Sequence, residues 1–401
     1  MTSPLIQIKN LSVHFKTPES VIEAVRGISF DIHVGQNIAL VGESGSGKSV
    51  TALSLLRLHD EARANYPSGE IIFDDMDLLK CEENKIRSIR GRDIAMIFQE
   101  PMTSLNPVYP VGVQLIEPLV LHQKLSKVQA KKIAIELLDR VGLPDPSRLI
   151  EGFPHMMSGG QRQRVMIAMA LACNPKLLIA DEPTTALDVT IQQQILELLG
   201  DLQKEFNMSV LMITHDLNLV KHYSEYVCVM KDGKIVEQSE TKSLFENPEH
   251  DYTKHLLSSE PQRITNDVED SNQYILDAED VRVYFPVTKG FFKRKVDEVK
   301  AVDQVDLQLS PGETLGIVGE SGSGKTTLGM SLLRLEKSTG SIVFEDKSIS
   351  YLLINESYGD LVEFDDNCLA SSLVKVRTSL KRSFTIDISF FSFDNLQACS
   401  H

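Results

Sequence analysis

Residues 42–49 read Gly42-Glu43-Ser44-Gly45-Ser46-Gly47-Lys48-Ser49, and this stretch decides the fold. It follows the apolar run Ile38-Ala39-Leu40-Val41 and precedes a helical pattern over residues 50–58. The glycines let successive backbone N–H groups curl around phosphate oxygens, and the following helix points the positive end of its dipole at them. Lys48 is placed to reach the β and γ oxygens, and the Ser49 hydroxyl is a ligand for Mg²⁺. Because a strand before and a helix after make an ordinary glycine-rich turn a poor alternative, the stretch predicts a phosphate-binding loop (P-loop) for a nucleoside triphosphate.

The P-loop and its surroundings occur twice in the sequence. Residues 35–41 return as residues 312–318, an offset of 277 (312 − 35 = 277), and a second P-loop follows directly at residues 319–326. Leu55-Leu56-Arg57-Leu58 returns as Leu332-Leu333-Arg334-Leu335, and residues 69–73 return as residues 340–344. Recurrence of several segments in the same order indicates a tandem duplication. We therefore expect a second set of phosphate-binding residues, namely Gly319, Ser321, Gly322, Ser323, Gly324, Lys325, Thr326 and Thr327.

Length and composition bound the class of protein. At 401 residues, with 42% hydrophobic and 24% charged residues, the chain has an ordinary globular composition and the length for two core-forming units. The formal net charge of −15 argues against a chain held mainly to nucleic acid by phosphate neutralisation. Five scattered cysteines without a C-x-x-C motif indicate neither a disulfide framework nor a zinc site, so a reducing cytosol is the simplest setting. No apolar run is long enough to cross a bilayer, and we expect that another subunit would hold the chain at a membrane.

The pattern of apolar runs predicts an α/β fold for the first copy. Strands near residues 5–15 and 27–32 precede the P-loop, and helical patterns at residues 127–140 and 161–173 follow it. Further strands are expected at residues 70–73, 94–98, 177–180, 210–214 and 226–230. Strands that feed loops carrying the chemistry are typical of an α/β P-loop unit.

The domain organisation is predicted to be unequal. We expect a first domain at residues 1–260, a polar linker at 261–276, a partial second domain at 277–350 and an unassigned tail at 351–401. Beyond about residue 351 no counterpart of the first copy is recognised, and the image of Asp181 would fall at position 452 (181 + 271 = 452), past the last residue. A frameshift or truncation near residue 350 is the favoured explanation, and a genuinely different ending is the alternative.

Two carboxylates end a buried strand of the first copy. Asp181 and Glu182 directly follow Leu177-Leu178-Ile179-Ala180. Asp181 is placed to hold Mg²⁺ beside Ser49, and Glu182 to orient or deprotonate the attacking water, because phosphoryl transfer depends mostly on positioning and charge neutralisation. The alternative, a solvated acidic turn, is disfavoured by the preceding P-loop and by the buried strand.

Three further features are consistent with a triphosphate site. Ser158-Gly159-Gly160-Gln161 opens a helix and predicts a second anion-binding helix N-terminus, facing a nucleotide held by a partner unit, with a plain helix cap as the alternative. His215 follows the strand at residues 210–214, within reach of a γ-phosphate, although a histidine in isolation is more often structural. Gln99 follows the strand at residues 94–98 and is a candidate ligand for Mg²⁺ or its water.

Taken in order, these motifs resemble the nucleotide-binding subunit of ABC transporters. The resemblance implies an α/β P-loop NTPase fold of the ABC ATPase type with a helical subdomain, followed here by an incomplete second copy. It implies the following roles: residues 42–49 the Walker A loop, Gln99 the Q-loop, Ser158, Gly159, Gly160 and Gln161 the signature, Asp181 and Glu182 the Walker B pair, Ala186-Leu187-Asp188 the D-loop, His215 the switch histidine and Phe15 the aromatic that stacks on adenine. It also implies ATP and Mg²⁺ as cofactors, catalytic roles for Glu182, His215 and Gln99, and metal ligation by Ser49, Gln99 and Asp181. Met157 stands where the family signature usually has Leu.

Two longer segments narrow the resemblance to dipeptide, oligopeptide and nickel importers. Gln99-Glu100-Pro101-Met102-Thr103-Ser104-Leu105-Asn106-Pro107 is similar to the Q-loop extension of that group, and Asn247-Pro248-Glu249-His250-Asp251-Tyr252-Thr253-Lys254-His255-Leu256-Leu257 is similar to its C-terminal signature. This resemblance implies transmembrane permease subunits as partners, an extracytoplasmic solute-binding protein as an indirect partner, and a peripheral position on the cytoplasmic face of the inner membrane. No nucleic acid partner and no iron–sulfur cluster are implied.

In the family that the chain resembles, each ATP lies between one unit's P-loop and the other unit's signature. The second copy lacks a recognisable signature and Walker B pair, so a complete site requires two first copies from different chains or another full subunit. The leading hypothesis is an ATPase that energises import of peptides or a related small solute. The alternatives are a nucleotide-binding but non-hydrolysing truncated product, and a soluble tandem ABC protein acting on ribosomes or DNA.

Overall fold

A computed structural model describes residues 3–18, 20–60, 62–99, 104–184, 189–258, 274–289, 294–319, 322–349, 362–363 and 375–376. The chain divides into two compact units: Met1–Leu187 with Ile191–Gln262, called the first unit, and Asp188–Thr190 with Arg263–His401, called the second unit. Each is described by itself. The domain boundaries expected from the sequence stay predictions.

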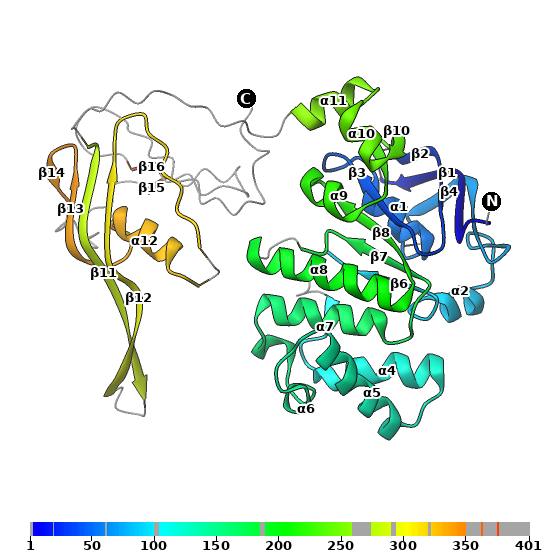
Figure 1. Cartoon of the computed structure of the whole chain (residues 1–401), viewed down its shortest axis with the longest axis horizontal. Coiled ribbons are helices and arrows are strands. Elements are labelled where there is room, and N and C mark those ends of the chain that lie inside the picture. Colours follow the sequence, from blue (N-terminus) through cyan, green and yellow to red (C-terminus); the bar gives the residue numbers. More distant parts are fainter. Residues whose placement is uncertain are drawn as a thin grey trace. The chain divides into compact units, whose positions relative to one another are not determined.

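The first unit alternates strands and helices after an initial antiparallel pair (Figure 1). Its strands are β1 (Ile6–Lys16), β2 (Val21–Ile32), β3 (Asn37–Val41), β4 (Ala64–Phe73), β5 (Met76–Asp77), β6 (Ile94–Ile97), β7 (Leu177–Asp181), β8 (Ser209–Thr214), β9 (Tyr226–Lys231) and β10 (Lys234–Glu240). Its helices are α1 (Lys48–Leu55), α2 (Glu83–Ile89), α4 (Val111–Gln123), α5 (Lys127–Arg140), α6 (Pro146–Leu149), the 3₁₀ turn η1 (Pro154–Met156), α7 (Gly159–Leu171), α8 (Val189–Phe206), α9 (Leu217–Tyr223), α10 (Thr241–Glu246) and α11 (Asp251–Ser258).

Two sheets form the body of the first unit. The larger has the strand order β10-β9-β3-β8-β7-β6, and all neighbouring pairs except β10–β9 are parallel. The smaller is antiparallel, with the order β2-β1-β4-β5. Parallel strands covered on both faces have continuous apolar sequences, and every residue of β7 and β8 is buried. This confirms the α/β fold and the presence of the expected strands, although β2 and β4 start earlier, at Val21 and Ala64, and β5 and β10 were not predicted.

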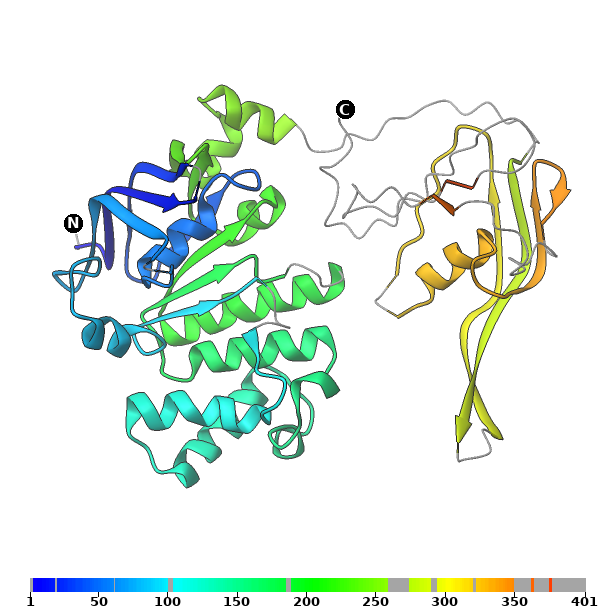
Figure 2. The ribbon, with the colours of Figure 1, turned by 180° about the vertical axis from the view of Figure 1, so that it is seen from behind.

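A helical layer packs on one side of the larger sheet. Figures 1 and 2 show α4, α5 and α6 gathered beyond α7, at the end of the first unit opposite α10 and α11. Apolar side chains of α4, α5 and α7, including Leu115, Leu138 and Val165, share one buried cluster with Ile97 of β6. Ser126 and Gln129 form a capping box that starts α5. The helical subdomain implied by the sequence is therefore present.

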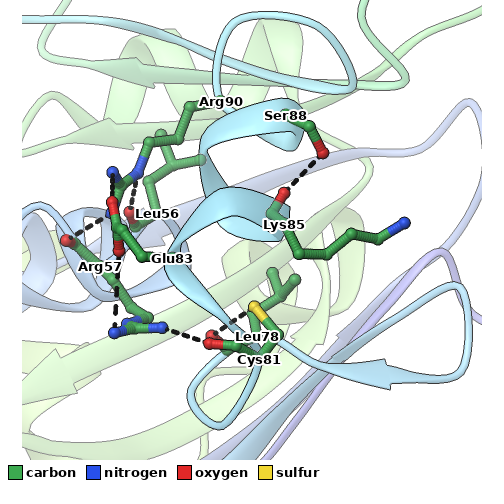
Figure 3. A network of polar contacts seen from close by, with 8 residues as sticks. All are labelled: Leu56, Arg57, Leu78, Cys81, Glu83, Lys85, Ser88 and Arg90. Atoms are coloured by element: carbon green, nitrogen blue, oxygen red, sulfur yellow. Dashed lines mark hydrogen bonds and ion pairs between the residues drawn. The ribbon is translucent and has the colours of Figure 1, made fainter.

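Hydrogen bonds connect the C-terminal end of α1, the helix that follows the P-loop, to α2 and the segment before it. Arg90 donates from Nε to the carbonyl oxygen of Leu56 at 2.7 Å and from Nη1 to Glu83 at 2.8 Å (Figure 3). Arg57 donates from Nη1 to the carbonyl oxygen of Cys81 at 2.8 Å. The carbonyl groups at the end of a helix lack intrahelical partners, and Arg90 satisfies those of Leu56 and, from Nη2 at 3.0 Å, Arg57, which fixes the end of α1.

The second unit repeats the smaller sheet of the first unit. It contains β11 (Leu276–Lys289), β12 (Arg294–Leu309), α12 (Lys325–Leu332), β13 (Thr339–Phe344), β14 (Lys347–Ser348) and the short pair β15 (Val362–Glu363) and β16 (Lys375–Val376). The strand order β12-β11-β13-β14 matches β2-β1-β4-β5. Leu276 lies opposite Leu309 and Phe344, as Ile6 lies opposite Ile32 and Phe73. The duplication read from the sequence is thus present in three dimensions.

Candidate nucleotide-binding site

The strand order of the larger sheet brings the predicted site residues to one edge. The P-loop follows β3, His215 follows β8, Glu182 follows β7 and Gln99 lies shortly after β6. These strands are neighbours in the order β3-β8-β7-β6 and run parallel, so their carboxyl ends meet. Loops at the carboxyl ends of parallel strands are the usual place for ligands in open α/β sheets.

The conformation of the first P-loop depends on glycines at two close approaches. A Cβ atom at Gly42 (φ 152°) would lie 2.2 Å from the carbonyl oxygen of Met230, and one at Gly47 (φ 102°) would lie 2.5 Å from that of Ala24. Both neighbours are backbone atoms of the sheets and cannot move aside. The loop therefore rests against β2 and β9, and α1 starts at Lys48.

Lys48 is held inside the P-loop. Its Nζ donates to the carbonyl oxygens of Gly42 at 2.7 Å and Glu43 at 2.8 Å, and contacts the Ser46 hydroxyl at 3.4 Å. Burial lowers the pKa of the Lys48 ammonium, and the negative charges of Glu182 and Asp181 oppose that effect. An ammonium group with neutral oxygen partners at a helix N-terminus is suited to bind an anionic phosphate.

Ser49 and Asp181 form an oxygen pair suited to Mg²⁺. The Ser49 hydroxyl donates to Oδ1 of Asp181 at 3.1 Å, joining α1 to the end of β7. Burial raises the pKa of the Asp181 carboxyl, which is 5% exposed and lies beside the charge of Glu182. The described residues contain no group of three or more His, Cys, Asp and Glu side chains that could hold a metal. Mg²⁺ binds proteins through one or two oxygen side chains and takes its other ligands from phosphates and water, so a serine hydroxyl and one carboxylate are a sufficient contribution from the protein.

Glu182 forms contacts with two other predicted site residues, Gln99 and His215. Gln99 donates from Nε2 to Oε2 of Glu182 at 2.8 Å, and Nδ1 of His215 lies 3.1 Å from Oε1. The hydrogen bond to Glu182 raises the pKa of His215, while burial opposes it. Glu182 itself has φ 46°, a conformation that non-glycine residues adopt mainly where function or tight packing requires it. Two side chains from the loops after β6 and β8 thus fix the direction of this carboxylate.

The signature residues start helix α7. The Ser158 hydroxyl accepts from the backbone N–H of Gln161 at 3.2 Å, and the Gln161 side chain accepts from the backbone N–H of Ser158 at 3.0 Å. This is a capping box, so the cap considered from sequence is present. Ser158 and Gly159 are exposed. A cap and an exposed anion-binding N-terminus are compatible, and the role of Ser158, Gly159, Gly160 and Gln161 toward a partner's nucleotide stays a prediction.

Phe15 lies beside a cavity of about 540 Å³ that is also lined by Lys16, Thr17, Pro18 and Arg63. The Phe15 ring meets the His59 ring edge to face, with centroids 5.1 Å apart. His59 is fixed in turn by the carbonyl oxygen of Val50, 2.9 Å from Nε2. Phe15 therefore has a defined orientation at the rim of a hollow, as a platform for a planar base requires, and its contact with adenine stays a prediction.

The second P-loop has a similar backbone. Gly322 and Gly324 have φ values of 82° and 96°, close to the 80° and 102° of Gly45 and Gly47. Nζ of Lys325 donates to the carbonyl oxygen of Gly319 at 2.7 Å, as Lys48 does to Gly42. Ser323 and Thr326 are exposed and Thr327 is partly buried on α12. Ser321 of this loop and the D-loop residues Ala186-Leu187-Asp188 lie outside the described residues.

Sequence reasoning missed two contacts that support the site. Gln163 is 1% exposed and donates from Nε2 to the carbonyl oxygen of Pro183, connecting α7 to the turn that carries Glu182. Gly233, in the turn between β9 and β10, donates its backbone N–H to the carbonyl oxygen of Ser46 at 3.1 Å. Gln163 stands in the polar run Gln161-Arg162-Gln163-Arg164, so its local sequence gave no signal that it is buried. The Gly233 contact depends on tertiary structure and has no local signal.

Three comparisons relate the chain to known proteins. The sequence profile of the family described as ABC transporter matches residues 25–185 and 302–373, so the second match continues past residue 350. A peptidoglycan transport ATP-binding protein, YejF, of Agrobacterium fabrum is 52% identical over 348 residues, which are 87% of this chain and 64% of that protein. A glutathione import ATP-binding protein, GsiA, of Pectobacterium atrosepticum is 42% identical over 87% of this chain and 61% of that protein. The chain thus spans a little under two thirds of the length of these relatives.

Solved structures give the same fold. The ATP-binding cassette MJ0796, in a dimeric post-hydrolysis state bound to ADP and Pi, is 30% identical and superposes with a TM-score of 0.53 over 59% of this chain and 98% of its own. The protein cbiO1 of Clostridium perfringens, part of the ABC transporter complex cbiONQ, is 29% identical with a TM-score of 0.52 over 61% of this chain and 92% of its own. Because the family profile covers more than half of the residues and the site geometry follows its motifs, the chain belongs to the ABC transporter family.

Proposed function

We propose that the chain is an ATP-binding and ATP-hydrolysing subunit that energises import of peptides or a related small solute through a membrane permease. The observation that carries this proposal is the joint placement of the P-loop, the Ser49–Asp181 pair and a Glu182 carboxylate fixed by Gln99 and His215. The names of the relatives, which refer to transport or import, support the direction and the class of solute.

In the proposed reaction each group has a defined task. Backbone N–H groups of the P-loop and the Lys48 ammonium bind the β- and γ-phosphates of ATP. Ser49 and Asp181 would hold Mg²⁺, with the Gln99 side chain as a further ligand of the ion or its water, and the ion would supply charge neutralisation on the phosphate oxygens. Glu182 orients the attacking water and accepts its proton, and His215 holds that carboxylate from the opposite side to Gln99. Catalysis then rests on positioning and electrostatics.

The partners follow from the same proposal. A helix N-terminus such as that of α7 is built to approach a phosphate, and the P-loop of the same unit already provides one such site, so the signature serves a nucleotide on a second ABC domain, in cis or in trans. Among the described helices none combines the length and the apolar sequence that a membrane span needs. The proposal includes a peripheral position on the cytoplasmic face of the inner membrane, where permease subunits hold the chain and an extracytoplasmic solute-binding protein delivers the solute to the permease. It also includes the domain boundaries at residues 260, 276 and 350 and a second nucleotide site at residues 319–327.

The test is MgATP hydrolysis by the purified chain over a range of protein concentrations, with Glu182→Gln as the control. Activity per chain that rises with concentration and disappears in the variant would support hydrolytic sites formed between chains. The variant keeps the size of Glu182, removes its charge and replaces one acceptor oxygen by an NH2 donor, from which a neutral His215 ring can accept, so its fold should be unchanged. ATP binding without turnover at any concentration would overturn the hydrolytic part of the proposal and favour a binding subunit that needs another ABC domain.

A further inference from the structure

The C-terminal helix of the first unit reaches the P-loop. Tyr252 on α11 is 6% exposed, and its hydroxyl accepts a hydrogen bond from the backbone N–H of Glu43 at 3.1 Å. The two residues are 209 positions apart in the chain. Glu43 is the second residue of the P-loop, so a side chain from the importer-like segment at residues 247–257 supports the backbone of the loop.

The Tyr252 ring is fixed on two sides. It shares a buried cluster with Val41, the last residue of β3, and Val229 of β9. Nζ of Lys231 lies 4.6 Å from the ring centroid, within the range of a cation–π contact. The Tyr252 ring thus packs from α11 onto β3 and β9, the two strands that support the P-loop. Its hydroxyl cannot turn away from Glu43 unless these packing contacts are broken.

The segment that carries Tyr252 is attached to β10. The Glu237 carboxylate accepts the backbone N–H groups of Glu249 and His250, both at 2.9 Å. Nδ1 of His250 accepts the backbone N–H of Tyr252 at 3.1 Å. The contacts therefore run without interruption from β10 through residues 249–252 to the P-loop.

We propose that Tyr252 is a positioning residue for the P-loop and that nucleotide occupancy of the loop is coupled to the order of residues 247–258. The inference rests on the proposed role of the loop as a nucleotide site. A P-loop binds phosphate with successive backbone N–H groups. A hydrogen bond that holds the peptide of Glu43 therefore fixes the direction of the backbone at the start of this series of N–H groups. Coupling free energies between two sites act equally in both directions, so bound nucleotide must in turn stabilise the segment.

The first test is MgADP binding to the full chain by titration calorimetry, comparing wild type with Tyr252→Phe. The variant keeps the ring and its packing and removes the acceptor of the Glu43 N–H. Loss of one hydrogen bond to a backbone group predicts a dissociation constant raised about fivefold. Tyr223→Phe, on α9 of the same unit, is the matched control and should bind MgADP as the wild type does.

The second test reads the coupling from the other end. Amide hydrogen exchange of residues 247–258 should slow when MgADP binds to the wild type, and this protection should be reduced in Tyr252→Phe. Glu237→Gln weakens the attachment of the segment without touching the P-loop, and we expect it to raise the dissociation constant in the same direction by a smaller factor. A purely structural tyrosine would change thermal unfolding but leave nucleotide-dependent exchange intact.

The outcomes separate the two proposals. If the wild type binds no MgADP, the proposed function of the loop fails. If the wild type binds and Tyr252→Phe binds equally well, with equal protection of residues 247–258, the positioning role is wrong and the nucleotide site stands.

Discussion

The two P-loops have nearly the same sequence and different surroundings. In the first unit the strand before the loop, β3, lies between β8 and β9, and Val41 is 0% exposed. In the second unit the equivalent residues 314–318 belong to no strand of the described part, and Val318 is 81% exposed. The glycine conformations and the lysine-to-carbonyl contact are nevertheless retained in the second loop. Local sequence thus determines the backbone conformation of the P-loop. The parallel sheet determines whether the other site residues lie next to the loop.

The end of the helix after each loop shows the same contrast. Arg57 and Arg334 both have positive φ, 47° and 61°, at matching positions of the repeated Leu-Leu-Arg-Leu segment. Arg57 donates to the carbonyl oxygen of Cys81, in the segment before α2, whereas Arg334 donates to the hydroxyl of Ser338 four residues away. The repeated sequence again gives the same backbone, and the long-range partners differ.

The largest effect should come from removing the lysine of each loop in turn. Lys48→Ala should lower MgATP hydrolysis by a factor of about 10² to 10³, because it removes a positive charge at the transferred phosphate. Lys325→Ala should change hydrolysis less than about twofold, because Asp181 and Glu182, the carboxylates proposed to hold Mg²⁺ and to orient the water, belong to the first unit. Steady-state phosphate release under saturating MgATP measures both. Equal losses in the two variants would mean that the second loop contributes to the hydrolytic site, and the contrast drawn here would be wrong.

Much of this contrast was readable from the sequence. The repeat predicted two P-loops, and counterparts of Gln99, Ser158 and Glu182 were recognised for the first copy alone within this sequence. The apolar runs of β7 and β8 identified the strand that ends in Asp181 and the strand that His215 follows, because strands covered on both faces have no polar alternation. The order of motifs along the chain was sufficient to find the family.

Other parts of the site had no local signal. The contact of Tyr252 with Glu43 joins residues 209 positions apart, and periodicity carries no information on such a pair. Glutamate has no preference for a positive φ, so the sequence could not indicate the backbone conformation of Glu182 either. Residues 314–318 kept the apolar sequence of a strand but are not one in the described residues, because a strand needs neighbours to pair with.

The burial difference between the two loops should appear as a difference in stability. Leu40 of β3 is 0% exposed and its repeat equivalent, Ile317, is 38% exposed. Leu40→Ala removes buried methyl groups from a packed core and should lower the free energy of unfolding of the first unit by about 3 kcal/mol. Ile317→Ala should lower that of the second unit by less than about 1 kcal/mol. Denaturant unfolding of the full chain, followed by circular dichroism, gives both values, and a large loss for Ile317→Ala would show that residues 314–318 are buried in solution.

The smallest expected effect is on the pH dependence of stability. Two histidines of the first unit, His215 and His59, should contribute to it with opposite signs. The hydrogen bond to Glu182 raises the pKa of His215 above its usual 6.5, so the stability from this pair is complete below pH 6.5 and is lost as pH rises through the raised pKa. Burial lowers the pKa of His59, so its contribution is complete above pH 6.5 and is lost as pH falls through the lowered pKa. His215→Gln should therefore flatten the decline of the melting temperature above pH 6.5, and His59→Gln the decline below it.

Thermal unfolding between pH 5 and pH 8.5 gives both profiles, and the two variants serve as controls for each other. The His215 side chain is 39% exposed, so solvent screens its ion pair with Glu182 and the change should be a small fraction of the total stability. Adding salt should weaken the His215 effect further, because screening acts on the ion pair. It should leave the His59 effect in place, because that effect arises from burial against the P-loop helix and Phe15. If salt reduces both effects equally, the pKa of His59 is set by neighbouring charges and not by burial against α1 and Phe15.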